Sequence, residues 1–261
     1  MAQEDRLGGL KEPFMSWIRS VAKKWLLHRG MIISQPPGQF VITPIKLRQM
    51  RKRGLEIGFA IDGGAAKGAW AQEFKTIYPE AQILCIEPRD AEQPELQKMA
   101  KELPGIHIAQ TLIGAAVGQV EFFESGDQSS MLKTGSGSTF GKTVTAEVTT
   151  LDELVRSRKL PWPDLIKLDL QGAELQALAG AAECLKHAQV VLLEVSFIAI
   201  HENMPLIGEV IPFMKERGFV CYDILGLWHR PLDGALGQGD FAFLNENNKL
   251  LADRRWSAEQ H

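Results

Sequence analysis

Residues 55–68 read LEIGFAIDGGAAKG, and this stretch decides the fold. The apolar run 57–61 is followed by Asp62, by Gly63 and Gly64, and then by Gly68. This pattern predicts a buried strand that enters a tight turn, because glycine adopts φ > 0 and lets the backbone approach a ligand closely. Residues 67–78 then have the pattern of a helix. A strand, a glycine turn and a helix in this order form the unit on which α/β folds bind nucleotides.

The alternation of strands and helices continues along the chain. We expect further strands at 81–86, 106–113, 165–170, 189–195, 219–225 and 240–244, and β structure at 117–123 and 143–148. We expect helices at 91–103, 173–185 and 206–217, and one that begins with the capping-box pattern at Thr150 and Glu153. Strands separated by helices of about 10–15 residues indicate a doubly wound, Rossmann-like α/β sheet.

Charge divides the chain into two parts. Residues 1–53 carry 11 Lys and Arg against 3 Asp and Glu, a net charge of +8, whereas residues 54–261 have a net charge of −11. We therefore expect a basic N-terminal extension (1–53) and a main domain (54–261). Aromatic and apolar residues at helical spacing within 12–29 predict an amphipathic helix. It either contacts an anionic membrane or substrate, or packs on the main domain or on a second copy in a homodimer.

Composition excludes several classes of protein. Three widely spaced cysteines, Cys85, Cys184 and Cys221, form no CxxC motif, which argues against a disulfide framework and fits a reducing cytoplasm. No apolar run reaches the roughly 18 residues of a membrane span, and the first residues do not have the pattern of a signal peptide. The acidic main domain argues against a nucleic-acid partner. We expect a cytoplasmic protein.

The glycine turn is compatible with more than one cofactor. A P-loop requires GxxxxGK[ST], which is absent, and a dinucleotide fingerprint requires GxGxxG, where this chain has Ala65 as the second glycine. Read as Asp62-x-Gly64-Ala65-x-x-Gly68, the turn fits S-adenosylmethionine (SAM), which has no pyrophosphate. We predict that Asp62, Gly63, Gly64, Ala65 and Gly68 bind the cofactor; the alternative is an ordinary tight turn.

A second acid supports a cofactor that contains ribose. Glu87 lies 19 residues after Gly68 and ends the apolar strand predicted at 81–86. An acid at about this spacing binds ribose hydroxyls in Rossmann-like folds, since a carboxylate accepts hydrogen bonds from both hydroxyls. We predict that Glu87 binds the cofactor ribose; the alternative is a solvated acid at the end of a strand.

Further acids follow the central strands. Asp169 ends one buried strand, and Glu194 lies near the end of the next one. If these strands are neighbours, both carboxylates reach the sheet edge where ligands bind, and a carboxylate in an apolar strand is costly unless it has a function or a partner such as Lys167. Glu174 opens the following helix, where an acid is favourable without any catalytic role.

The chain resembles the FkbM family of SAM-dependent methyltransferases over residues 58–244. The resemblance rests on the glycine turn, on Glu87-Pro88, on Ser129-Ser130-Met131, on residues 150–154, and above all on residues 166–174, IKLDLQGAE. It implies a seven-stranded methyltransferase sheet whose last strand, 240–244, is antiparallel. It also implies methyl transfer to a hydroxyl oxygen of a sugar, polysaccharide or polyketide. Gln171 stands where many relatives have Glu, which argues against a catalytic or metal-binding role at that position.

The chemistry of such a reaction selects candidate residues. An alcohol that accepts a methyl group must lose a proton, so a base or a metal ion would help. We predict Asp169, Glu194 and His201 as catalytic residues, although His201 can equally be an ordinary loop histidine. Asp169, Ser129 and Ser130 are further candidates for cofactor binding, the two serines within the Gly/Ser-rich loop 125–141. A divalent metal is possible, but no motif demands one.

Two other functions fit the sequence. One is a nucleotide (NAD)-dependent oxidoreductase on the same kind of sheet, against which Ala65 and residues 166–174 argue. The other is a non-catalytic partner protein that retains the fold. A SAM-dependent methyltransferase acting on a small-molecule or glycan acceptor is the interpretation that we favour.

Overall fold

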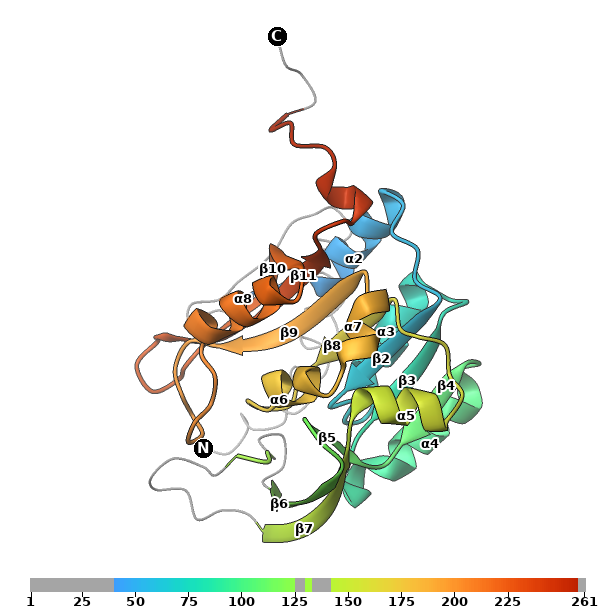
Figure 1. Ribbon diagram of the computed structural model, residues 1–261, viewed down its shortest axis with the longest axis vertical. Coiled ribbons are helices and arrows are strands. Elements are labelled where there is room, and N and C mark those ends of the chain that lie inside the picture. The colour runs from blue at the N-terminus through green and yellow to red at the C-terminus, as the bar shows by residue number, and fades with distance from the viewer. Residues whose placement is uncertain (1–39, 125–129, 133–141, 258–261) are drawn as a thin grey trace, which may run out of the picture.

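The apolar runs of the sequence form one large sheet with helices on both faces (Figure 1). The computed structural model describes residues 40–124, 130–132 and 142–257. Eight strands of this part form the main sheet, in the order β1-β10-β11-β9-β8-β2-β3-β4. Their bounds are β1 (Phe40–Val41), β2 (Phe59–Gly63), β3 (Gln82–Ile86), β4 (Ile106–Ala109), β8 (Leu165–Leu168), β9 (Val190–Ser196), β10 (Phe219–His229) and β11 (Leu236–Asn245).

Strand directions confirm the predicted doubly wound fold. β4, β3, β2, β8 and β9 are parallel, and β11 pairs antiparallel with both β9 and β10. The predicted seven strands, with the last one in the chain antiparallel, are therefore present. β1 adds a short eighth strand, which pairs antiparallel with β10.

Helices cover each face of the main sheet. α2 (Thr43–Lys52), α3 (Ala69–Ile77) and α4 (Gln93–Glu102) pack on one face. α5 (Leu151–Ser157), α6 (Glu174–Ala179), α7 (Ala182–His187) and α8 (Ile207–Glu216) pack on the other. Short 3-10 turns occupy Asp90–Glu92 and Lys249–Leu251. Thr150 caps α5 by accepting a hydrogen bond from the backbone N–H of Glu153, at 3.1 Å.

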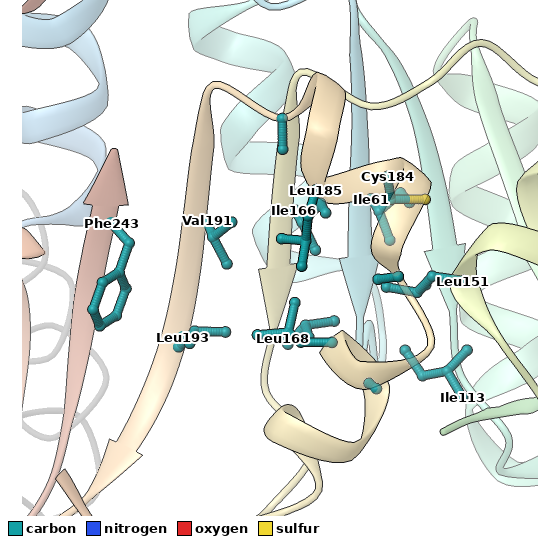
Figure 2. Close-up of a cluster of buried hydrophobic side chains, with 14 of the residues drawn as sticks. Ile61, Ile113, Leu151, Ile166, Leu168, Cys184, Leu185, Val191, Leu193 and Phe243 are labelled. Atoms are coloured by element: carbon teal, nitrogen blue, oxygen red, sulfur yellow. The ribbon is translucent and has the colours of Figure 1, made fainter. Parts of the chain in front are cut away.

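The core under α5–α7 is built from matched positions on adjacent strands. Ile61, Ile166, Val191 and Phe243 face one another in register across β2, β8, β9 and β11 (Figure 2). Each large apolar side chain buried in this way contributes about 1.5–3 kcal/mol. Because side chains alternate along a strand, the residues that follow Ile61 and Ile166 lie on the opposite, α2–α4 face.

A second, smaller sheet lies beside the end of β4. It consists of β5 (Leu112–Ile113), β7 (Lys142–Thr149) and β6 (Gly118–Glu124), in that order. The prediction of one strand over 106–113 was wrong, since the chain leaves the main sheet after Ala109 and enters the small one. Leu112, Phe122 and Val148 form its small core.

The single helix expected at 173–185 is two helices, α6 and α7, which are separated at Gly180 and Ala181. Glycine is required at position 180 because a Cβ there would lie 2.2 Å from the Gly114 carbonyl oxygen. The helix expected within 12–29 lies outside the described residues.

α2, from the segment assigned to the basic extension, buries Leu47 and Met50 in the core of the main sheet. Across the described residues, no helix has the length and apolar character needed to cross a bilayer.

Candidate active site

Two adjoining cavities lie where the parallel strands of the main sheet end. The Glu87 cavity, of about 290 Å³, is lined by the buried Glu87 at the end of β3. The Glu194 cavity, of about 480 Å³, lies at the N-terminal ends of α2 and α3, beside Thr43 and Ala69. Gly64, Ala66 and Asp169 line both cavities, so the two cavities share one wall.

The two cavities differ in chemical character. The walls of the Glu87 cavity are mainly apolar, and the small sheet supplies several of them. These apolar residues are Ile86, Leu112, Ile113, Phe122, Met131 and Leu170. The Glu194 cavity is strongly charged, with an excess of acids. Its charged residues are Lys67, Glu92, Lys167, Asp169, Glu194 and Asp240.

Glu87 is held in place from two directions. Its Oε2 accepts a hydrogen bond from the backbone N–H of Ala66 at 2.9 Å, which ties the acid to the glycine turn. Its Oε1 accepts from the backbone N–H of Arg89 at 3.0 Å and from Arg89 Nε at 2.8 Å. Glu87 therefore follows a buried strand, as predicted, and lines a cavity. Its binding of a cofactor ribose stays a prediction.

The glycines of the turn serve backbone packing. Gly64 has φ = +73°, and a Cβ there would lie 1.9 Å from the Asp169 carbonyl oxygen. The N–H groups of Gly64 and Ala65 both donate to the Ile86 carbonyl at 3.0 Å, so they are already satisfied within the protein. Gly64 and Ala65 line a cavity, whereas Gly63 and Gly68 do not. The structure thus places only part of the predicted turn at a ligand surface.

Asp62 lies beneath the turn and pairs with the central lysine. It is fully buried, and Lys167 Nζ lies 2.9 Å from its Oδ1. Burial raises the pKa of Asp62 above its usual value, and the charge of Lys167 partly offsets this effect. Lys167 also donates to the Gly64 carbonyl at 3.2 Å, so this pair fixes the floor of the turn.

A hydrogen-bonded chain joins the acids of the Glu194 cavity. Gln171 Nε2 donates to Asp169 Oδ1 at 3.0 Å and to Glu194 Oε2 at 2.9 Å. Gln238 Nε2, from β11, donates to the same Glu194 oxygen at 2.9 Å. Asp240 is paired with Glu194 in the antiparallel register of β11 and β9. The predicted convergence of Asp169 and Glu194 is therefore observed.

Burial and like charges raise the pKa of Glu194 and of Asp240. Burial, followed by the charges of Asp169, Glu174 and Asp240, raises the pKa of Glu194 well above its usual value, and Lys167 opposes the shift. Burial and then Asp169 raise the pKa of Asp240 to about 7. A carboxylate with a raised pKa is a stronger base when ionised, and such groups cluster at functional sites.

Ser130, a predicted cofactor-binding residue, and Glu174 both support the turn 170–172. Ser130 Oγ donates to the Gln171 carbonyl at 2.9 Å and lines neither cavity. Glu174 Oε1 accepts from the backbone N–H groups of Leu170 at 2.7 Å and Gly172 at 3.2 Å. Burial raises the pKa of Glu174 to about 7. Both side chains therefore stabilise the turn through hydrogen bonds to its backbone.

His201 and Ser129 are not brought to the cavities. His201 is buried, lines neither cavity, and finds no hydrogen-bond partner for its ring nitrogens among the described residues; burial lowers its pKa. Its catalytic role stays a prediction. Ser129 lies outside the described residues. Within the part of the chain that the structure describes, no three His, Cys, Asp or Glu side chains are placed to hold one metal ion.

Sequence reasoning missed several residues of the site. Arg89 and Thr111 line the Glu87 cavity, and Asp240 lines the Glu194 cavity. Arg89 follows Glu87-Pro88 directly, so its position next to a predicted cofactor-binding residue could have indicated that it belongs to the site. Gln238 and Asp240 depend on the pairing of β11 with β9, for which the sequence carries no local signal.

A known protein family matches more than half of the chain. The family described as the methyltransferase FkbM domain matches residues 62–221, which is well over half of the chain. The chain belongs to the FkbM methyltransferase family. It is accordingly a SAM-dependent methyltransferase, and the nicotinamide-dependent alternative is not supported.

Individual relatives are distant. The chain is 26% identical over 162 residues to the 2-O-methyltransferase NoeI of Sinorhizobium fredii, a match that covers 56% of this chain and 67% of that protein. Among solved structures, methyltransferase FkbM from Methylobacillus flagellatus KT matches with a TM-score of 0.48 and 18% identity, over 77% of this chain but only 48% of that one. A protein described as a putative sarcosine dimethylglycine methyltransferase from Galdieria sulphuraria gives a TM-score of 0.47 and 12% identity, over 79% of this chain and 86% of that one.

Proposed function

We propose that this FkbM methyltransferase transfers a methyl group from SAM to a hydroxyl oxygen of a sugar-containing acceptor. The observation that carries this proposal is the wall of Gly64, Ala66 and Asp169 that two cavities share. One cavity is apolar and has an acid at the end of a strand, and the other contains the partly buried carboxylate of Glu194, whose pKa is raised. The relative named as a 2-O-methyltransferase supports oxygen as the methylated atom.

The residues around the two cavities fit the cofactor. Glu87 would bind the ribose hydroxyls, and the apolar walls around Leu112 and Phe122 suit a flat base. The excess of acids around Asp169 suits a positively charged sulfonium and ammonium. When bound, SAM supplies an electrophilic methyl group on its sulfonium sulfur. Asp62 and Gly64 would hold the turn against which the cofactor lies.

Glu194 is the group that we assign as the base. Its Oε2 is held by two amides, and Oε1 receives no hydrogen bond from the described residues. Oε1 would accept the proton that the acceptor hydroxyl loses as its oxygen forms the bond to the methyl carbon and the carbon–sulfur bond breaks. Because the pKa of Glu194 is raised, this oxygen is a better base than an exposed carboxylate. Asp169, at the shared wall, would orient the reacting groups.

The test uses methyl-labelled SAM and a panel of neutral mono- and oligosaccharides. We expect label in an alkali-stable methyl ether for at least one sugar, whereas transfer to a carboxylate would give an alkali-labile ester. Glu194→Gln should lower kcat by about 100-fold or more, which is the contribution typical of a general base. It should leave the affinity for S-adenosylhomocysteine within about threefold, because the change removes charge without removing bulk.

The exposed Glu202, in the loop after the same strand, provides the matched control. Glu202→Gln should methylate at the wild-type rate. Binding of S-adenosylhomocysteine without transfer to any acceptor would favour the non-catalytic alternative. Full turnover by Glu194→Gln would remove Glu194 from the mechanism.

A further inference from the structure

Gln171 connects the two carboxylates nearest the shared wall. Both hydrogens of its amide nitrogen are used, one on Asp169 Oδ1 at 3.0 Å and one on Glu194 Oε2 at 2.9 Å. Two carboxylates this close repel each other, and a donor between them offsets that repulsion. The neutral amide supplies the donor without adding a third negative charge.

The backbone at Gln171 is held in an unusual conformation. Its φ is +52°, in the left-handed region that costs a residue with a side chain roughly 1–2 kcal/mol. Hydrogen bonds hold the turn there: Ser130 Oγ donates to the Gln171 carbonyl, and Glu174 accepts from the N–H groups of Leu170 and Gly172. Strain of this kind persists where the surroundings enforce it, and it is frequent at functional sites.

The two amides on Glu194 leave its carboxylate asymmetric. Gln171 and Gln238 both donate to Oε2, and no described residue donates to Oε1. Glu194 lines the Glu194 cavity. The anchored oxygen therefore fixes the orientation of the carboxylate, and the other oxygen remains available to a ligand.

The charges that face Glu194 come from β8 and the residue after it, from α6 and from β11. Asp169 follows β8, Glu174 begins α6, and Asp240 lies opposite on β11, and all three disfavour the ionised form. Lys167, on β8, favours it. Against three acids and one lysine, the two amide donors are the other groups among the described residues that stabilise the ionised carboxylate.

We propose that Gln171 is a positioning residue for methyl transfer, whose amide bridges Asp169 and Glu194 and keeps the Glu194 carboxylate oriented and ionised. This inference rests on the proposed role of Glu194 as the base. It assigns a function to the position at which the chain has an amide in place of an acid.

The decisive variant is Gln171→Asn. Asparagine tolerates positive φ at least as well as glutamine, but its amide is one methylene too short to bridge both carboxylates. Glu194 can be followed by carbon-detected NMR of the protein labelled at its glutamate carboxyls, with Glu194→Gln for assignment. Losing one donor to the ionised form should raise the pKa of Glu194 by about one unit, a tenfold change in acid dissociation.

A control and two further variants complete the experiment. Gln176→Asn, at an exposed position on α6, should leave the titration of Glu194 unchanged. Gln238→Asn removes the other donor to the same oxygen and should also raise the pKa of Glu194. Gln171→Met keeps the length of the side chain and removes both donated hydrogens, so it provides the measurement if Gln171→Asn does not fold. A titration that stays within about 0.2 unit of wild type in the folded variants overturns the proposal.

The kinetic readout separates positioning from structure. With a sugar that accepts the methyl group, the acidic limb of the kcat profile of Gln171→Asn should move upward by the same amount, and the rate should recover at high pH. A lower plateau with an unmoved limb would mean that Gln171 is merely structural. A shifted titration with full turnover by Glu194→Gln would instead contradict Glu194 as the base, so the two failures are distinguishable.

Discussion

Glu87 is satisfied within the protein before any ligand enters. Backbone N–H groups of Ala66 and Arg89 hold one oxygen each, and the guanidinium of Arg89 contacts both oxygens, at 2.8 Å and 3.4 Å. Arg89 also pairs with Glu92. Ribose hydroxyls would therefore compete with the guanidinium for Glu87, which lowers the net gain from each new hydrogen bond.

This competition sets the size of the expected effect at Glu87. Glu87→Gln keeps the shape of the side chain and removes its charge. A hydrogen bond to a charged group is worth about 1.5–3 kcal/mol, and competition from Arg89 favours the lower end, so we expect S-adenosylhomocysteine to bind about tenfold more weakly. Isothermal titration calorimetry measures this directly.

Glu95 provides the control for that measurement. It is an exposed acid on α4, paired with Lys67 at 3.6 Å. Glu95→Gln should bind S-adenosylhomocysteine with the affinity of the wild type. Equal affinity of wild type and Glu87→Gln would show that Glu87 does not bind the cofactor.

At the residue level, part of the candidate site could be predicted from the sequence. Glu87, Asp169 and Glu194 could be predicted because each follows or ends a parallel strand, and parallel strands end at one edge of a sheet. Asp240 and Gln238 could not, because their approach to Glu194 depends on the antiparallel register of a strand more than 40 residues away.

At the scale of elements, prediction succeeded where the structural reason is local in the sequence. It failed where the reason is a contact between segments that are distant in sequence. The strand, turn and helix at 59–77 could be predicted because the need for glycine at position 64 is local. The turn gives this residue a positive φ, which favours glycine. The break between α6 and α7 could not be predicted in this way. Gly180, at the break, lies against the carbonyl of Gly114, and a contact with such a distant segment leaves no local pattern in the sequence. The split of 106–113 between two sheets likewise depends on distant pairing, since β4 pairs with β3 whereas β5 pairs with β7.

The close approach at the first turn gives a stability prediction. Gly64→Ala would place a Cβ against the Asp169 carbonyl and force alanine to adopt φ = +73°. Positive φ costs roughly 1–2 kcal/mol and overpacking roughly 1–3 kcal/mol, so we expect unfolding free energy to fall by about 2–5 kcal/mol. Urea denaturation measures the change.

Gly208 gives the matched glycine control. It lies in α8, and a Cβ there would meet nothing within 4 Å. Gly208→Ala should be neutral or stabilise the protein by up to about 1 kcal/mol, as expected for alanine in a helix. If the two variants had similar stabilities, the contact between the turn and β8 would be much looser than the structure indicates.

At the scale of the whole molecule, buried acids should control the dependence of stability on pH. Burial raises the pKa of Glu174 and of Asp240 to about 7, from ordinary values of 4.5 and 3.8. Such groups bind protons more tightly in the folded than in the unfolded chain, so their contribution to stability is lost as pH rises through the folded pKa. We expect the unfolding free energy to fall between pH 5 and 8.

Glu174→Gln tests this directly, because it removes one of the titrating groups. Its stability should fall less steeply than that of the wild type over the same interval. Glu216→Gln, at an exposed position on α8, should keep the wild-type slope. The exposed Asp233, whose pKa is lowered to about 2 by Arg230, titrates below this window. Parallel profiles for wild type and Glu174→Gln would contradict the prediction.

The small sheet makes the fold modular. Its three strands all lie between residues 112 and 149, and every strand of the main sheet lies outside that interval. It nevertheless supplies Leu112, Ile113 and Phe122 to the Glu87 cavity. Exchanging this one continuous segment between related chains would therefore remodel a wall of the cavity while leaving the strand order and the acids at the sheet edge intact. The segment is a natural crossover unit for building chimeric enzymes.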